Sequence, residues 1–211
     1  EIKRRIYDTF PTQNRAVTQA DYENMIYRMP SKYGSVKRCS VQRDPDSRRR
    51  NLNVYIISED RNGNFTQSNS TIKNNLKTWM NNYRMLSDTI DVLDAFIINF
   101  GIDFVVQPKK DTDKFTLVDE CVQKLVTEFS NVKYFIGEHI SISDIYTKLS
   151  EVEGVMSVSS VTIRNKKGAN YSSVTFDVGG NTSPDGSSVV IPKNAVAELK
   201  FPSVDITGKI K

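Results

Sequence analysis

The sequence predicts an α+β fold made of two small mixed α/β modules, each with a short sheet packed against helices. Apolar residues recur at helical spacing behind capping residues in several segments, and runs of β-branched and aromatic residues bounded by turn residues lie between those segments. The composition, 38% hydrophobic and 26% charged over 211 residues, is that of a globular chain. We expect the first module to cover residues 1–108, as helix, strand pair, helix and strand. The second should cover residues 109–211, as helices followed by strands.

The first helix is predicted to begin at Thr18 and to end near Met29. In the segment Thr18–Asp21, a hydroxyl and a carboxylate three residues apart have the spacing of a capping box, which satisfies free N–H groups at a helix start. The apolar residues that follow up to Met29 fall on one helical face, and Pro30 cannot continue the helix.

A strand pair and a strand-helix-strand unit should follow. Val36–Val41 and Leu52–Ile57 are rich in β-branched residues, and the turn Asp44–Ser47 lies between them, so we expect the two strands to pair. Asn69 or Ser70 can cap an amphipathic helix that reaches Tyr83. The strand Phe96–Val106 then completes a unit that favours a parallel strand pair.

The second module, residues 109–211, is predicted to open with the charged hinge 108–113. Apolar residues at helical spacing predict one helix over residues 117–129 and another over residues 141–152, capped at Ser141 and closed by Gly154. The predicted strands are Val155–Ile163 and Tyr171–Val178, joined by a polar turn, and a last short strand over Ser188–Ile191.

Composition and charge bear on which class of protein this chain belongs to. The longest apolar stretches, such as Ala95–Phe100, are far shorter than the roughly 20 residues that a membrane-spanning helix needs. The net charge of +4 and the pI near 8.9 are lower than in a dedicated nucleic-acid binder. Cys39 and Cys121 match no metal or redox spacing, so we expect two buried free thiols. The chain begins at Glu1 without an initiator Met, and we expect it to be a piece of a longer polypeptide.

No residue pattern predicts a catalytic, cofactor-binding or metal site. His139 has no second His and no nucleophile in an elbow motif, which favours a surface or helix-flanking position. The pairs Asp44 with Asp46 and Asp111 with Asp113 lack the loop of a calcium site, and turn formation explains them better.

Two features are candidates for an interface. The cluster Arg48–Arg50 is open to three interpretations: a solvated loop, a contact with an acidic protein face, or a contact with nucleic-acid phosphates. Trp79 and Tyr83 share the apolar face of their helix, where core packing is favoured over an exposed hot spot. The candidate interface residues are therefore Arg48, Arg49, Arg50, Trp79 and Tyr83.

Several segments together resemble the baseplate J-like family over nearly the whole chain. They are Asn14–Glu23, Gly34–Val36 and Leu52–Ile57, then Ile140–Tyr146 with Val152–Val155, and finally Ile191–Lys193 and Phe201–Ile206. The Asn-rich helix around Trp79 and the turn Asp44–Asp46 make the chain most similar to the carboxy-terminal part of the baseplate wedge proteins of T-even-type contractile-tailed phages.

The resemblance implies a structural protein of a virion. Such proteins sit in the tail baseplate, are assembled in the host cytoplasm, pair with copies of themselves in the inner ring, and clamp neighbouring wedge and sheath-initiating subunits. It implies no enzyme activity, no cofactor, no membrane and no specific nucleic acid as a partner. The alternatives are a component of a related contractile injection system, a metal-dependent hydrolase and a nucleic-acid-binding module.

Overall fold

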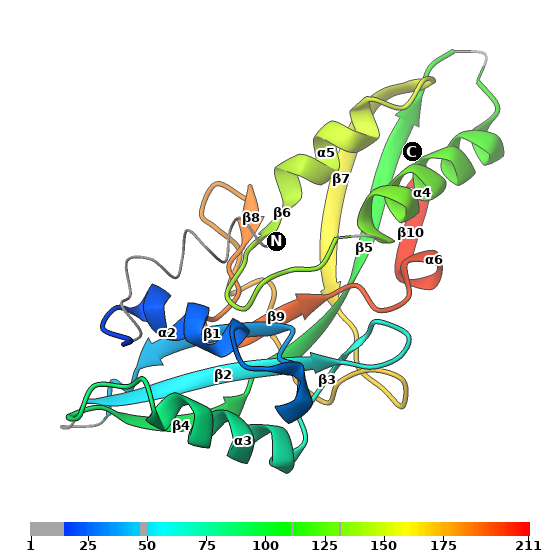
Figure 1. Cartoon of the computed structure of the whole chain (residues 1–211). Helices are drawn as coiled ribbons and strands as arrows, with labels where there is room; N and C mark the ends of the chain where they lie inside the picture. The colour runs from blue at the N-terminus through cyan, green and yellow to red at the C-terminus, as the bar shows by residue number, and fades with distance from the viewer. Residues whose placement is uncertain (1–14, 47–49, 111, 131) are drawn as a thin grey trace. The chain divides into compact units, whose positions relative to one another are not determined.

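The computed structural model describes residues 15–46, 50–110, 112–130 and 132–211, and the chain divides into two compact units, residues 1–95 and 96–211 (Figure 1). The fold is α+β, as predicted, and each unit has its own sheet packed against helices. The division falls at the start of strand β5 (Phe96–Pro108), whereas the sequence placed the module boundary at the end of the same strand.

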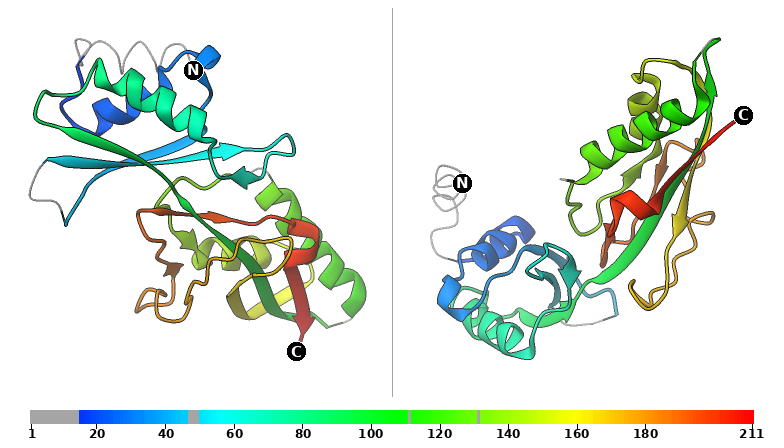
Figure 2. Two further views of the ribbon diagram at one scale, coloured as in Figure 1. Left: turned by 90° about the horizontal axis from the view of Figure 1, so that it is seen from below. Right: turned by 90° about the vertical axis from the view of Figure 1, so that its right-hand side faces the viewer.

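Unit 1 is a four-stranded mixed sheet with two α-helices on one face (Figure 2). Buried residues of both helices and of three strands form one apolar cluster, which includes Tyr22, Leu76 and Val54. In chain order its elements are α2 (Gln19–Tyr27), the 3-10 helix η1 (Ser31–Tyr33), β1 (Arg38–Arg43), β2 (Asn51–Glu59), β3 (Phe65–Thr66), α3 (Ser70–Asn81) and β4 (Thr89–Asp94).

The predicted start of α2 is confirmed atom by atom. The Asp21 backbone N–H donates to Thr18 Oγ1 at 3.2 Å, and the Thr18 N–H donates to the Asp21 carboxylate at 2.9 Å. This reciprocal pair of hydrogen bonds is a complete capping box. The helix ends before Pro30, as expected.

The predicted strand pair and the predicted strand-helix-strand unit are both present, but the last strand of that unit is a different one. β1 and β2 are antiparallel, as predicted. The strand that pairs in parallel with β2 after α3 is β4, so the prediction of Phe96–Val106 for this position was wrong. In β4 the half-buried or buried Ile90 and Val92 alternate with exposed residues. This one-sided pattern is a weaker sequence signal than the nearly continuous apolar run that follows it.

Unit 2 is organised around the long strand β5. Its first residues pair in parallel with β9, its second half pairs in parallel with β10, and its other edge pairs antiparallel with β7. Helices α4 and α5 lie on one face of this sheet (Figure 2). In chain order the elements are β5 (Phe96–Pro108), α4 (Lys114–Ser130), β6 (Ile140–Ser141), α5 (Ile142–Ser150), β7 (Val155–Asn165), β8 (Ser188–Val189), β9 (Ala195–Glu198), α6 (Pro202–Asp205) and β10 (Ile206–Ile210).

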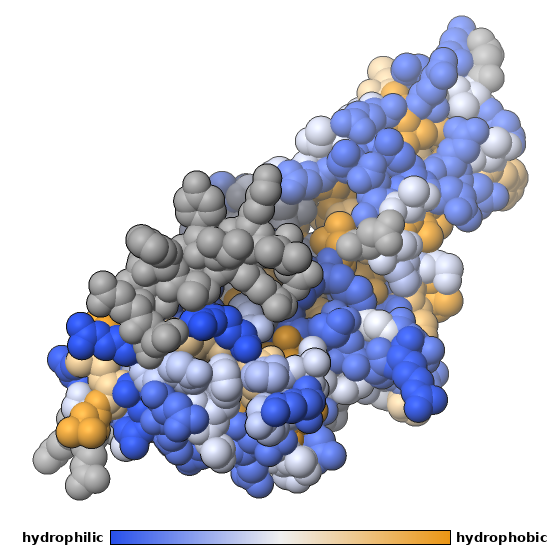
Figure 3. All heavy atoms as spheres, viewed as in Figure 1, coloured by the Kyte–Doolittle hydropathy of each residue, from blue (hydrophilic) through white to orange (hydrophobic). Residues whose placement is uncertain are grey.

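Three predicted elements of unit 2 are confirmed: α4, α5 and β7. Ser141 caps α5, since its hydroxyl accepts from the Asp144 N–H at 3.1 Å. Gly154 adopts a φ of +95°, a left-handed conformation that glycine adopts without strain, in the turn that leads into β7. The outer surfaces of α3, α4 and α5 are mainly hydrophilic, as expected for amphipathic helices (Figure 3).

Two strand predictions in unit 2 were wrong. Residues 171–178 belong to none of the strands in the described part of the chain, because side-chain amides rather than a neighbouring strand bind this segment. Ser188–Ile191 is not the last strand, because β9 and β10 follow it. β9 is a four-residue, fully buried strand and β10 follows a single helical turn, so neither has a long periodic pattern in the sequence.

Candidate interaction surfaces

The candidate arginine cluster is only partly described. Arg48 and Arg49 lie outside the described residues. Arg50 is exposed, and its carbonyl accepts a hydrogen bond from the Thr89 N–H at 2.9 Å, at the point where β4 begins to pair with β2. The backbone of Arg50 therefore has a role in the sheet, while a role of its side chain in an interface stays a prediction.

Trp79 and Tyr83 lie half-buried at the end of α3, against the apolar cluster of unit 1. Their ring centroids are 4.9 Å apart, and the indole N–H of Trp79 donates to the Met25 carbonyl in α2 at 2.9 Å. Trp79 thus joins α3 to α2, and the Tyr83 ring packs against Trp79. This is the packing that the sequence favoured, and an interface role for either ring is untested.

A groove of about 360 Å³ runs beside β4 in unit 1. Both signs of charge line it, and they are largely paired: Lys73 Nζ lies 2.6 Å from the Asp94 carboxylate, and Lys77 Nζ lies 3.5 Å from that of Asp91. The lining residues are Asp44, Asn51, Asn53, Ser70, Lys73, Asn74, Lys77, Asp91, Val92 and Leu93.

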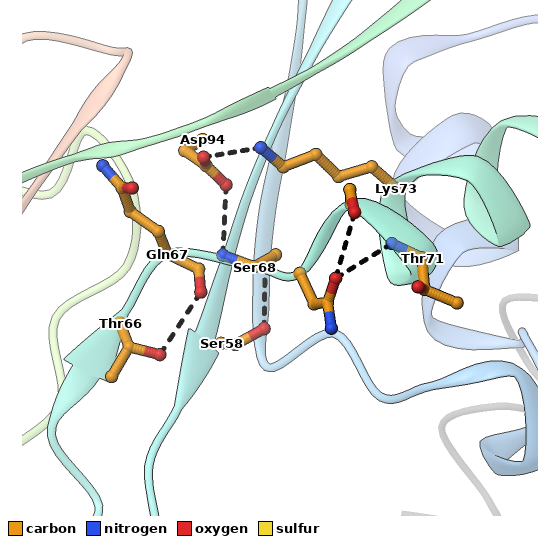
Figure 4. A network of polar contacts seen from close by, with 9 residues as sticks. Ser58, Thr66, Gln67, Ser68, Thr71, Lys73 and Asp94 are labelled. Carbon is orange, nitrogen blue, oxygen red and sulfur yellow. Dashed lines mark hydrogen bonds and ion pairs between the residues drawn. The ribbon is translucent and has the colours of Figure 1, made fainter.

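Asp94 connects the end of β4 to the start of α3 (Figure 4). Its carboxylate accepts the Ser68 N–H at 3.1 Å in addition to binding Lys73, and the Ser68 hydroxyl shares a hydrogen bond of 2.8 Å with that of Ser58 in β2. Asn69 accepts the Thr71 N–H at 3.1 Å and so caps α3. The sequence had predicted that either Asn69 or Ser70 would be this cap. Lys73, which lines the groove, is therefore held by a polar network that joins β2, β4 and the start of α3.

In unit 2 a fully buried carboxylate, Asp205, binds three groups: two side chains from the loop after β7 and one backbone N–H from its own segment. Its Oδ1 accepts the Tyr171 hydroxyl at 2.7 Å and lies 3.5 Å from Lys166 Nζ, and its Oδ2 accepts the Phe201 N–H at 3.0 Å. The hydrogen bond to Asp205, together with burial, raises the pKa of Tyr171 to about 12. A buried carboxylate requires such partners. Asp205 therefore anchors the chain that follows β7 to the end of the sheet.

A second anchor lies beside the first. Asn99, buried in β5, accepts the Ser172 N–H at 2.7 Å and donates to the Glu198 carboxylate in β9 at 2.8 Å. We call Asn99, Lys166, Tyr171 and Asp205 the loop anchor. Nothing in the local sequence predicted it, because its members come from β5, the loop after β7 and the segment before β10.

The face of the unit 2 sheet opposite α4 and α5 is polar. The Asp103 carboxylate in β5 accepts from Arg164 in β7 and from the Thr207 hydroxyl in β10. Nearby, the Ser157 hydroxyl donates to Gln107 at 2.9 Å. This face therefore carries cross-strand polar pairs.

The remaining titratable candidates have structural partners. His139 Nδ1 accepts the Ile191 N–H at 3.2 Å. Asp113 accepts the Thr116 N–H at 3.2 Å near the start of α4, and its hydrogen bonds with Thr116 lower its pKa, while its predicted partner Asp111 lies outside the described residues. Among the residues that the structure describes, no three His, Cys, Asp or Glu side chains are grouped so that they could hold a metal ion.

Both cysteines are buried free thiols, as predicted. Burial raises the pKa of Cys39 to about 12 and that of Cys121 to about 11. None of the described helices combines the length and the apolar character needed to cross a bilayer.

Similarity to known proteins is found at the level of the fold. No protein-family model matches the sequence, and no curated protein matches it. Among solved structures, the fold is similar to that of a chain in the cryo-EM structure of the anti-feeding prophage baseplate, which was six-fold symmetrised. The TM-score is 0.54 and the identity is 11%, and the match covers 95% of this chain and 42% of that chain. The present chain thus spans less than half of its structural neighbour, and the likeness concerns the fold.

Proposed function

We propose that this chain is a structural subunit of a phage-tail-like baseplate, which works by binding other subunits and catalyses no reaction. The observation that carries the proposal is the fold likeness to a baseplate chain over 95% of the present chain. A fold can serve unrelated functions, so the role is our inference from this likeness. The resemblance of sequence segments to the baseplate J-like family points independently to the same role.

In its finer form the proposal concerns the position of the subunit. We place it in the inner ring of the baseplate, where copies of the chain pair and clamp neighbouring wedge and sheath-initiating subunits. A closed ring of identical subunits needs interfaces that repeat around an axis. Because the structural neighbour is a chain of the anti-feeding prophage baseplate, we propose a related contractile injection system as the host particle at least as readily as a T-even-type tail.

The two-unit organisation suits this role. Each unit has its own sheet, and the apolar cluster of unit 1 is built from that unit alone. A subunit with separate cores can change the contacts of one unit without unfolding the other. We propose that a change of this kind is transmitted around the ring when the tail contracts.

The direct experiment is to locate the chain in assembled particles. The chain would carry a small epitope tag, and purified particles would be imaged with an antibody against it. We expect the label at the baseplate end of extended particles. Label along the sheath, or particles that assemble normally without the chain, would contradict the proposal.

Light scattering tests the self-pairing separately. We expect the average mass of the purified chain to rise above that of a monomer as its concentration increases through the micromolar range. A mass that stays at the monomer value would count against pairing through this chain.

A further inference from the structure

Residues 171–178 have the side-chain pattern of a strand without a strand partner. Val174, Phe176 and Val178 are half-buried, whereas Ser173, Thr175 and Asp177 are exposed, which is the period-two alternation of a half-buried strand. None of the described strands pairs with this segment, which runs as a coil after β7 (Figure 1).

The two edges of this segment are bound unequally. Asn165 Nδ2 donates to the carbonyls of Val174 and Phe176, at 3.3 Å each. In an extended chain, the backbone groups of alternate residues point to the same side, so those of Ser173 and Thr175 point to the other side. These backbone groups have no hydrogen-bond partner in the described part of the chain, and both residues are exposed.

Side chains bind parts of the outer edges of β1 and β7. On β1, the Cys39 N–H donates to the Tyr27 hydroxyl at 3.1 Å and the Val41 N–H to the Glu23 carboxylate at 3.2 Å. On β7, the Val161 N–H donates to the Tyr146 hydroxyl at 3.0 Å. Free edges recruit other chains, and such caps prevent this. On the outer edge of residues 173–177 the Asp177 carbonyl accepts from the Asn181 side-chain amide at 2.8 Å, and none of the described side chains binds the backbone of Ser173 or Thr175.

We infer that residues 173–177 form an antiparallel strand pair with the same residues of a second copy of this chain. The inference rests on the self-association in the proposed function and assigns a surface to it. The two-fold axis passes beside Thr175, which then faces its own counterpart, while Ser173 faces Asp177. A Thr–Thr pair across strands is favourable.

The charges of the segment favour a second copy as the occupant. Asp177 is the one charged residue of 171–178, and in this register it faces a serine instead of another carboxylate. Lys167 Nζ lies 3.2 Å from Thr175 Oγ1, on the exposed side of the segment. The incoming Asp177 is the diagonal neighbour of Thr175, within reach of this ammonium group.

Disulfide trapping tests the register. Oxidation of a Thr175→Cys variant should give a covalent dimer, because residues facing each other in this pair have Cα atoms about 5.5 Å apart. Ser173→Cys is the matched control: in this register the two Ser173 positions are offset by four residues, about 14 Å along the strands at roughly 3.4 Å per residue. An equal mixture of Ser173→Cys and Asp177→Cys should cross-link. The native thiols are buried and should not compete.

Charge variants test the two-fold symmetry. Thr175→Lys and Thr175→Glu should each weaken self-association by about tenfold, since each places like charges opposite one another. Mixing the two variants should restore association, which only a contact between copies at this position explains.

The inference is overturned if the native chain dimerises while Thr175→Cys gives no more covalent dimer than Ser173→Cys, or if both charge variants associate like the native chain. Those results would leave the proposed baseplate function standing with a different contact surface. If the chain is not found in baseplates, the proposed baseplate function is rejected, whereas the disulfide trapping of Thr175→Cys would still report whether copies pair through this segment.

Discussion

Replacing Tyr171 by Phe isolates the contribution of the loop anchor to stability. The change removes one hydroxyl, which donates to the fully buried Asp205 at 2.7 Å. It keeps the aromatic ring, whose centroid lies 5.7 Å from that of Phe201 in an edge-to-face arrangement. After the substitution, Asp205 retains Lys166 and the Phe201 N–H as partners.

The expected loss of stability follows from the kind of hydrogen bond. A hydrogen bond to an ionised group contributes about 1.5–3 kcal/mol, and a buried carboxylate that loses a donor cannot recover the bond from water. We therefore expect the Tyr171→Phe variant to lose about 2 kcal/mol in the free energy of unfolding of unit 2. For a domain of roughly 100 residues, this lowers Tm by about 8 °C or more.

The pH dependence gives an independent check on the same hydrogen bond. The pKa of Tyr171 is raised in the folded chain from 10.0 to about 12. A raised pKa stabilises the fold while the group is protonated in both states, and this contribution is lost as pH rises through the folded value. The stability difference between the native chain and the variant should thus be constant below about pH 10 and shrink towards pH 12.

Urea unfolding followed by circular dichroism measures both quantities. Tyr33→Phe is the control, because the Tyr33 hydroxyl is exposed and binds no described residue. A Tyr171→Phe variant as stable as the control at neutral pH would refute the assignment of Asp205 as an anchor that depends on this hydroxyl.

Three further outcomes are expected. Gly101→Ala should destabilise unit 2 by about 1–3 kcal/mol in urea unfolding, because its new methyl carbon would lie 2.8 Å from the Asp205 carbonyl, and a cost near zero would contradict this packing. Trp79→Phe should cost about 1–2 kcal/mol through loss of the indole hydrogen bond to α2, without changing self-association, and weaker association would support an interface role instead. Cys39 and Cys121 should react with a thiol reagent at pH 8 only after unfolding, since both are buried, and rapid labelling of the folded chain would refute this.

The sequence predicted best what neighbouring residues determine. The capping box at Thr18 and Asp21 was read correctly, because both partners lie within one helical turn. The loop anchor was missed, because Tyr171 and Asp205 are 34 residues apart and meet only through the sheet. Strand partners were missed for the same reason: the parallel neighbour of β2 depends on long-range pairing, and the more apolar segment was not the one that pairs.

The incorrect strand prediction for residues 171–178 carries information of its own. Alternating Val174, Phe176 and Val178 with Ser173, Thr175 and Asp177 is a local pattern that fits a half-buried strand, and the structure keeps the burial pattern but not the ladder. Asn165 supplies the hydrogen bonds on the inner edge. Local preference and final fold normally agree, and disagreements concentrate where a chain functions. The other edge is open at Ser173 and Thr175. An incoming strand would therefore complete, at these residues, the pattern that the sequence encodes.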